Sequence, residues 1–294
     1  MLEKNPTGLY FSENTVFYQE LLQTYQNMGG LLPPHVTVQD VQGDTAEWQR
    51  MGTLKMQKHM KFNKVAMNQP EMEKVKILVE EFSTGSPTDT LFENQMKISY
   101  RQGLINNLNL AVQRKLDQII LDTLQENVSE YPFVVNENVG GKNTNLNVDK
   151  LRKAKRLMDK NNVPAQDRIA IIDVNSEHKL MQEEDVKNSL YNNTKVLVNG
   201  SIGSYYGTQL LPLTDIDNED GLIIENNIRS NFVVQKGAVG LAYSTRPKLE
   251  INKIPDSPGH NILIVMSVGC AILNPKGIVH IKTYEDPNEF DDNL

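Results

Sequence analysis

One long amphipathic segment, Asn94 to Asn127, constrains the fold of this chain more than any other feature. Its apolar residues recur at spacings of three and four, which is the pattern of one helix face: Leu104, Leu108, Ala111, Val112, Leu116, Ile119, Ile120 and Leu124. The opposite side is polar and includes Arg114, Asp117 and Gln118, so we expect that side to face water.

This segment is also long and uninterrupted. No proline occurs between Pro87 and Pro132, and Thr90–Glu93 fits a capping box. At about 1.5 Å per residue the segment could reach roughly 50 Å. Gly103 is a candidate break between a short leading helix and a long trailing one, over about 98–127. We therefore expect one long, stiff helix that packs in the core and spans much of the subunit, and we call it the beam.

The composition is that of a soluble globular protein. Of 294 residues, 39% are hydrophobic and 23% are charged. No apolar run approaches the roughly 18 residues of a membrane helix, and the first residues do not resemble a secretory signal. The net charge of −7 argues against a protein that grips nucleic acid over its whole surface. The single cysteine, Cys270, lies in an apolar run, which indicates a buried structural thiol and excludes a multi-cysteine zinc site.

The N-terminal part predicts an arm followed by a projecting loop. Residues 1–34 carry aromatic anchors, a short helix over 15–27 and the stop Met28-Gly29-Gly30 before two prolines. Strands are expected over 36–42 and 73–82, paired with each other, because both alternate polar and apolar residues.

Between these strands lies a poorly patterned, basic insertion with several methionines, at about 41–70. A long insertion of this kind is usually functional. Trp48 is expected to anchor this loop on a neighbouring subunit, where Lys55, Lys58, Lys61 and Lys64 would meet an acidic surface. The alternative interpretation is a solvated excursion with spare lysines.

The second half alternates helices and strands. We predict an amphipathic helix over 148–162, a buried strand over 169–173 and a helix over 176–190 capped by Ser176. A strand–turn–strand follows up to 213, and further strands are expected over 232–244, 246–254, 260–275 and 277–285. Two segments are acidic. The first is the surface loop 214–221, whose Asp215, Asp217, Glu219 and Asp220 are expected to contact a neighbouring subunit. The second is the tail 285–294, of which residues 286–294 are predicted to be mobile.

No motif calls for catalysis or for a cofactor. VGGKN lacks the first glycine and the Ser or Thr of a phosphate loop, and the glycines at 200, 203 and 207 do not open a helix. Residues 214–221 lack the glycine and the final glutamate of a calcium loop. Asp173 and His178 could form a pair, but a solvated histidine on a helix is the simpler interpretation. We expect no enzyme, no metal and no cofactor.

Several short motifs, in their order along the chain, resemble major capsid proteins of tailed bacteriophages. They are Asn161-Asn162-Val163-Pro164, Asp167-Arg168 with the strand Ile169–Asp173, Gly200-Ser201-Ile202-Gly203, Tyr206-Gly207, Leu211-Pro212 and the closing SVGCAILNPKGIVHI of 267–281. The long helix and the insertion fall where that family has its spine helix and extended loop.

The resemblance implies an α+β Hong Kong 97-type capsid fold. It implies an N-terminal arm (1–34), a peripheral domain (35–132) with its extended loop and spine helix, an axial domain (133–235), return strands of the peripheral domain (236–284) and an acidic tail (285–294). The acidic loop would sit near the capsomer axis.

The same resemblance implies a function. Copies of the chain would form the pentamers and hexamers of an icosahedral head, assembled in the host cytoplasm, that encloses double-stranded DNA without sequence-specific binding and without contact to a membrane. A separate scaffolding protein would be a partner, because the sequence starts directly with the arm. A portal and a decoration protein would be further partners. Two alternatives stay open: an encapsulin-like compartment for cargo protein, and a soluble α/β enzyme with a site near 148–212.

Overall fold

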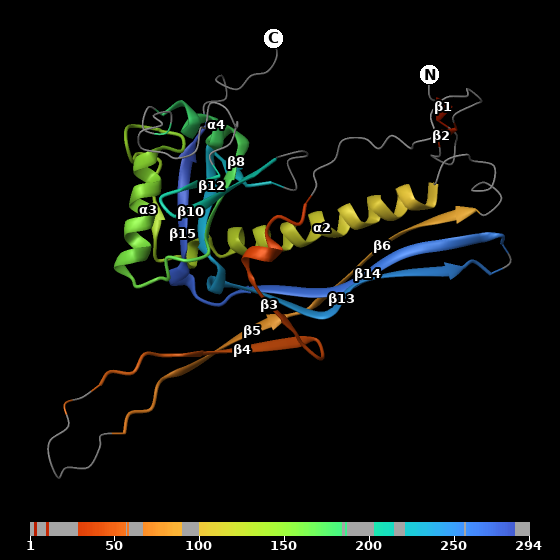
Figure 1. Ribbon diagram of the computed structural model, residues 1–294, viewed down its shortest axis with the longest axis horizontal. Helices are drawn as coiled ribbons and strands as arrows, with labels where there is room; N and C mark the ends of the chain where they lie inside the picture. The colour runs from red at the N-terminus through yellow and green to blue at the C-terminus, as the bar shows by residue number, and fades with distance from the viewer. Residues whose placement is uncertain are drawn as a thin grey trace.

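The protein has a body at one end, a long flat wing beside it and a hairpin that projects from the wing (Figure 1). The computed structural model describes residues 3–4, 10–11, 29–56, 58, 67–89, 100–183, 186, 203–214, 221–255 and 257–285. Within these residues the chain forms a seven-stranded sheet, a four-stranded sheet and two two-stranded pairs.

The beam is helix α2, Tyr100–Glu126, which lies inside the predicted range 98–127. Its core face repeats every four residues: Leu108, Val112, Leu116, Ile120 and Leu124 are all buried. Gly103 does not break the helix, because α2 runs through it without interruption. The predicted capping box at 90–93 lies outside the described residues.

The wing is a four-stranded sheet that α2 covers on one face (Figure 1). Its strand order is β3-β13-β14-β6. The strands are β3 Thr37–Asp40, β6 Glu80–Asp89, β13 Val239–Lys253 and β14 Gly259–Ile272. β3 runs parallel to β13, and the other pairs are antiparallel.

Three strand predictions were wrong. The strand at 36–42 does not pair with 73–82, because β3 pairs instead with the distant β13. The region 73–82 is interrupted at Val79 into β5, Met72–Leu78, and β6, which belong to different sheets. The single strand predicted over 232–244 is likewise two strands, β12 and β13, separated by the 3₁₀ turn η3, Lys236–Ala238.

The body is built on the seven-stranded sheet, in the order β7-β15-β12-β8-β10-β9 with β11 paired to β12. The strands are β7 Val134–Val135, β8 Arg168–Asp173, β9 Ser204–Tyr205, β10 Thr208–Leu213, β11 Ile224–Glu225, β12 Ile228–Gln235 and β15 Ile278–Tyr284. The last of the predicted return strands (236–284), β15, pairs with β12 and β7 and not with the wing.

Both faces of this sheet are buried, as the central strand β8 shows. Ile169 and Ile171 enter a core shared with α2 and the wing, whereas Ala170 and Ile172 enter a second core beneath helix α3. Because successive side chains of a strand point to opposite faces, a strand covered on both sides needs apolar residues throughout. This is why residues 169–172 form a continuous apolar run.

Two helices cover the second core. α3, Val148–Lys160, begins at Asn147, whose side chain accepts a hydrogen bond from Lys150 N. α4, Val174–Gln182, begins at Asp173, which accepts from Ser176 N. The prediction that Ser176 caps this helix was wrong by three residues, and most of the predicted extension to 190 lies outside the described residues.

A turn held by Arg168 joins α3 to β8. Its guanidinium is buried, donates to the carbonyl oxygens of Val163 (2.6 Å) and Pro164 (2.8 Å) and pairs with Asp159 at 2.7 Å. Asn162 and Asp167 adopt positive φ angles of 58° and 55° within the turn, which asparagine and aspartate tolerate better than most residues. The Asn-Asn-Val-Pro and Asp-Arg motifs therefore specify one compact connection.

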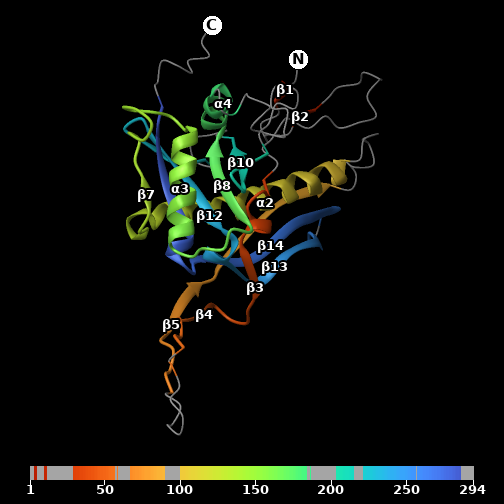
Figure 2. The same ribbon diagram turned by 60° about the vertical axis from the view of Figure 1, so that its left-hand side comes forward.

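The remaining elements are small. The hairpin consists of β4, Thr45–Met51, and β5, and it projects away from the body in both views (Figures 1 and 2). β1, Glu3–Lys4, pairs with β2, Tyr10–Phe11. Short 3₁₀ turns are η1 Pro33–His35, η2 Val128–Glu130 and η4 Pro275–Gly277.

Candidate assembly surfaces

The β4–β5 hairpin has two unlike faces. On one face the opposed pairs are Ala46–Ile77, Trp48–Val75 and Arg50–Glu73, and on the other they are Thr45–Leu78, Glu47–Lys76, Gln49–Lys74 and Met51–Met72. Only the base of the first face is buried, where Ala46 and Ile77 pack on Ala242 of β13. The outer half of the hairpin contacts little of its own subunit (Figure 1).

Charge pairs along the hairpin hold the two strands together. Arg50 pairs with Glu73, and Lys74 pairs with Glu47 at 2.9 Å. These pairs are exposed, so each contributes little to stability. An isolated two-stranded hairpin is marginally stable in water. The outer half therefore needs a further surface to lie on.

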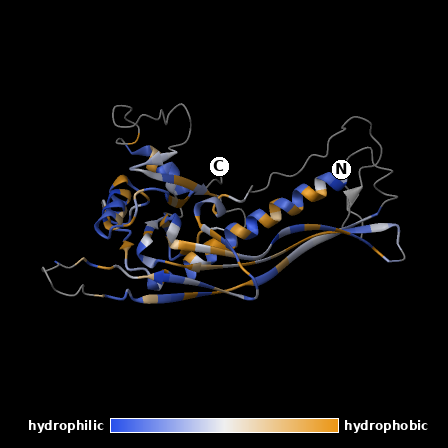
Figure 3. Cartoon of the chain, turned by 60° about the horizontal axis from the view of Figure 1, so that its bottom comes forward, coloured by the Kyte–Doolittle hydropathy of each residue, from blue (hydrophilic) through white to orange (hydrophobic). Residues whose placement is uncertain are grey.

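Apolar side chains are exposed along this outer half. Met56 is 102% exposed and Met67 93%, while Met51, Leu54 and Met72 are each near 60%. Flexible thioether side chains suit a surface that adapts to a partner. In Figure 3 hydrophobic and hydrophilic residues alternate along α2, the pattern of an amphipathic helix.

The predicted contact residues of the loop occupy different environments. Trp48 is half-buried against its own small core with Val41 and Val79, so its contact with a neighbouring subunit stays a prediction. Lys55 and Lys58 are exposed beyond the end of β4. Lys61 and Lys64 lie outside the described residues.

Asp117 anchors the segment that precedes β3 to the beam. Its carboxylate accepts hydrogen bonds from the backbone N–H groups of Leu31 (3.1 Å) and Leu32 (3.0 Å). The side chain is buried, which corrects the prediction that this side of the helix faces water. Burial raises the pKa of Asp117 more than the backbone N–H donors lower it.

Close approach of the backbone explains the Gly29-Gly30 pair. Gly29 has a φ of +55°, and a Cβ atom there would lie 2.5 Å from the backbone nitrogen of Arg114. Only glycine fits both conditions without a shift of the chain. The sequence signal for this anchor was present as two adjacent glycines, but it was interpreted only as a helix stop.

The acidic loop itself lies outside the described residues, including Asp215, Asp217, Glu219 and Asp220. Its flanks are placed. Leu213 and Leu222 pack in the core shared with α2, and Gln125 of α2 donates to the carbonyl of Gly221 at 3.2 Å. The loop therefore starts and ends on the α2 side of the seven-stranded sheet.

A buried polar network closes the end of that sheet. Arg229 of β12 binds Glu285 through two N–O contacts of 3.0 and 3.1 Å, and its Nε lies 3.7 Å from Asp173. Burial and the adjacent Asp173 carboxyl raise the pKa of Glu285, against the lowering effect of Arg229. Glu285, the first residue of the predicted acidic tail (285–294), is buried, and the rest of that tail lies outside the described residues.

Asn231, beside this network, donates to Thr283 at 2.7 Å and accepts from the backbone of Asp173. Asp173 and His178 do not pair, because Asp173 caps α4 while His178 contacts Gln182 at 3.0 Å. Cys270 is half-buried in β14, and burial raises the pKa of its thiol to about 12, so it is a poor nucleophile at neutral pH.

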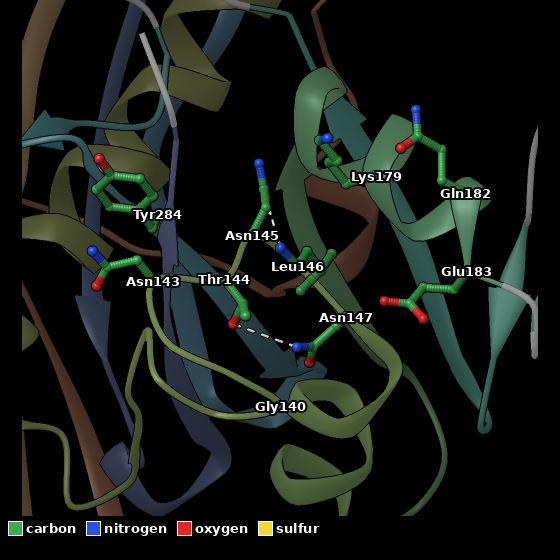
Figure 4. A pocket seen from close by; sticks show the side chains of 10 residues that line it. All are labelled: Gly140, Asn143, Thr144, Asn145, Leu146, Asn147, Lys179, Gln182, Glu183 and Tyr284. Atoms are coloured by element: carbon green, nitrogen blue, oxygen red, sulfur yellow. Dashed lines mark hydrogen bonds between the residues drawn. The ribbon is translucent and has the colours of Figure 1, made fainter. Parts of the chain in front are cut away.

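A polar cavity of about 510 Å³ lies between the segment before α3 and the end of α4 (Figure 4). It is lined by Gly140, Asn143, Thr144, Asn145, Leu146, Asn147, Lys179, Gln182, Glu183 and Tyr284. Amides dominate this lining, and none of these residues forms a nucleophile–base pair. Among the described residues no group of histidine, cysteine and carboxylate side chains is arranged to hold a metal ion. No described helix is long and apolar enough to span a membrane.

Comparison with known proteins points to one kind of protein. The family model described as phage capsid protein matches residues 13–285. No curated protein matches the sequence.

Several solved structures share the fold. The capsid of the cyanophage P-SCSP1u has 17% identity and a TM-score of 0.69, with 93% of this chain and 94% of that chain covered. The head of the Helicobacter pylori bacteriophage KHP40 has 11% identity and a TM-score of 0.71, with coverage of 95% and 96%. The capsid of Ralstonia phage GP4 has 11% identity and a TM-score of 0.68, with coverage of 94% and 96%. At identities this low, the likeness establishes the fold.

Proposed function

Because this chain belongs to the phage capsid protein family, we propose that it builds the phage head by placing its β4–β5 hairpin on an adjacent copy of itself. The chain is a major capsid protein with the Hong Kong 97-type α+β fold, and it associates with itself into the shell of the virion.

The observation that carries the hairpin proposal is the exposure of its apolar residues. Met56 and Met67 have almost no contact with their own subunit, and they lie beyond the ends of β4 and β5, a strand pair that would be only marginally stable alone. Contiguous exposed apolar groups on a soluble protein mark an interaction surface. Lys55 and Lys58 beside them supply positive charge toward an acidic neighbour in a chain of net charge −7.

The two larger sheets provide the cores of the two domains that we propose. We assign the four-stranded sheet, α2 and the hairpin to the peripheral domain, and the seven-stranded sheet with α3 and α4 to the axial domain. In this arrangement the axial domains meet around the centre of pentamers and hexamers, and the peripheral domains form the lattice between them. The closed icosahedral shell encloses double-stranded DNA, with scaffolding, portal and decoration proteins as further partners and no catalytic step.

The proposal is tested with the double variant Met56→Glu, Met67→Glu. Since neither side chain is packed within its own subunit, the variant should fold as the wild type does, by circular dichroism and thermal unfolding. Assembly, followed by sedimentation and negative-stain electron microscopy with a scaffolding protein present, should fail. The matched control is Met56→Leu, Met67→Leu, which keeps the apolar surface and should assemble.

Normal shells from the glutamate variant would refute the role of the hairpin. The contents of purified wild-type shells test the enclosed cargo separately, because DNA supports the head and a cargo enzyme supports a protein compartment.

A further inference from the structure

An apolar groove of about 280 Å³ lies between α2 and β6, the outermost strand of the wing. Helix α2 lies over this part of the sheet (Figure 1). Because no described strand pairs with the outer edge of β6, the groove is at the side of the subunit. The apolar part of its lining comes from three elements: Phe82 and Thr84 of β6, Ala111 and Val112 of α2, and Ile264 and Met266 of β14.

The strand register explains why the groove is there. Phe82 is opposed to Met266, and Thr84 is opposed to Ile264. Directly opposed residues share one face of a sheet, and here it is the face that α2 covers. Thr84 is exposed and Ala111 is only half-buried, so their small side chains leave apolar surface uncovered at the edge of the core. Uncovered apolar surface of this kind marks a site for a partner.

The end of the groove next to Phe82 is acidic. Glu80 lies on the same face of β6 as Phe82, because side chains alternate along a strand, and Glu81 follows it. Both carboxylates are exposed, and neither has an ion-pair partner among the residues that the structure describes. The cation of the groove, Lys115, is already engaged: its Nζ lies 5.2 Å from the centre of the Phe82 ring and donates to Gln118 at 2.9 Å.

Met56 of the hairpin has the complementary properties. It is fully exposed and lies between Lys55 and Lys58 in sequence, both of which are exposed as well. An unbranched side chain fits an irregular apolar groove, and a thioether next to an aromatic ring such as that of Phe82 is favourable. Met67 is similarly exposed, but Asn68 and Gln69 beside it carry no charge.

The hairpin of the same subunit does not reach this groove, because it projects away from the wing in both views (Figures 1 and 2). An extended chain places Met56 roughly 30 Å beyond Ala46 at the base of the hairpin. That reach suits a neighbouring molecule. The occupant to consider is therefore the hairpin of a second copy.

We propose that Met56 of one copy inserts into the groove between α2 and β6 of the next copy. Lys55 and Lys58 then lie beside Glu80 and Glu81 of that copy. The inference rests on the proposed function and names the place where the hairpin binds. Because the hairpin and the groove are different surfaces of one subunit, the contact is head-to-tail and closes into a ring when the rotation allows.

The first test fills the groove. Ala111→Phe adds a ring inside it, and the matched control Asn109→Phe adds the same ring at an exposed position on the other side of α2. Circular dichroism and thermal unfolding establish that both variants fold. Assembly is followed by sedimentation and electron microscopy with a scaffolding protein present. Ala111→Phe should lower the shell yield by about tenfold or more, since the loss repeats at every copy, and Asn109→Phe should not.

A folded Ala111→Phe variant that assembles normally would overturn the inference. If Met56→Glu, Met67→Glu still fails to assemble in that case, the hairpin binds elsewhere and the proposed function stands. If the double glutamate variant also forms normal shells, the proposed function fails with it. A control that loses as much yield as Ala111→Phe would likewise overturn the inference.

The second test exchanges the charges. One variant carries Lys55→Glu and Lys58→Glu, another carries Glu80→Lys and Glu81→Lys, and a third combines the two sets and restores the wild-type net charge. The control for the second variant is Glu126→Lys, Glu130→Lys, which reverses two exposed carboxylates beyond the groove. The first two variants should lose shell yield and the third should recover it. A folded combined variant that assembles no better than the other two would contradict the inference.

Crosslinking gives a readout that does not depend on shell yield. The variant Met56→Cys, Thr84→Cys, with Cys270→Ser to remove the native thiol, is treated with a short bismaleimide after assembly. It should give covalent ladders of chains, whereas Met56→Cys, Asn109→Cys in the same background should not. Shells without a ladder would overturn the inference, and so would a Thr84→Cys that links to the scaffolding protein instead of a second copy.

Discussion

Glu285 and Arg229 form a buried two-pronged ion pair that joins the end of β15 to β12, with N–O distances of 3.0 and 3.1 Å. Asp173 stands beside them, so one guanidinium faces two carboxyl groups. Arg229 also donates to the carbonyl of Leu222, at the flank of the acidic loop, at 3.1 Å.

Replacing Arg229 with methionine should strongly destabilise the subunit. The change leaves two buried carboxyl groups without their cation, and breaking a buried pair in this way costs about 3–5 kcal/mol. Urea unfolding measures the loss. The matched control is Arg246→Met, because the Arg246–Asp40 pair is exposed and should contribute little to stability. Equal effects of the two substitutions would contradict the importance of burial.

Gly29→Ala should release the segment 29–32 from the beam. The added Cβ would meet the backbone of Arg114 at 2.5 Å in a residue whose φ is already +55°. Gly43→Ala is the control, since Gly43 also has a positive φ, +99°, but has open space around it. Hydrogen exchange should show faster exchange of the Leu31 and Leu32 amides in the first variant only. Unchanged protection there would show that the chain accommodates the contact.

Asp117→Ala should weaken the same anchor from the helix side. Hydrogen bonds to a charged group contribute about 1.5–3 kcal/mol, and two backbone donors would lose their acceptor. Asp122→Ala, an exposed carboxylate on the same helix, should change the free energy of unfolding by only about 0.5 kcal/mol. Differential scanning calorimetry and exchange of the Leu32 amide compare the two variants. The anchor is unimportant if both variants behave alike.

The stability of the subunit should fall as the pH decreases from about 6.5 to 4, in part through His280. Burial, with a smaller effect of Lys282, lowers the pKa of His280 to about 4 in the folded state. In the unfolded chain a histidine has its ordinary pKa of about 6.5, so between these values the unfolded state binds the extra proton and folding weakens as acid is added. The contribution of neutral, buried His280 to the free energy of unfolding is fully present above the unfolded-state pKa of about 6.5. It amounts to about 3 kcal/mol at most.

The variant that tests this prediction is His280→Phe. It keeps an aromatic ring stacked against Phe232 and removes the titrating group. Urea unfolding at a series of pH values should show a shallower loss between pH 6.5 and 4 in this variant than in the wild type. Identical slopes would mean that other groups account for the acid sensitivity.

Local pattern was a good guide to elements and a poor guide to their partners. The spacing of Leu108, Val112, Leu116 and Leu124 placed α2 correctly, because the apolar repeat of a helix can be recognised from a few consecutive turns of sequence. It could not show that Asp117 is covered, because the covering residues Leu31 and Leu32 lie 86 and 85 positions away in sequence.

The same limit applies to strands and to the functional surfaces. β3 alternates as a strand should, but nothing in its own sequence names β13 as the partner. Glu285 lies next to an acidic stretch in the sequence, so the sequence alone assigns it to the tail. Only its pairing with Arg229 shows that it is a core residue. The projecting hairpin was predicted from weak patterning and composition, whereas the half-buried position of Trp48 depended on distant residues such as Ala242.

The unequal sizes of the buried cores have a mechanical consequence. The core between α2 and the two sheets is continuous, so bending the subunit there would open many close-packed contacts at once. The hairpin is held at its base mainly by Ala46, Ile77 and Ala242, and flexing it disturbs far fewer contacts. A lattice that must curve differently at its corners and on its flat facets therefore strains least where the hairpin leaves the wing. The subunit combines a stiff plate with one compliant joint.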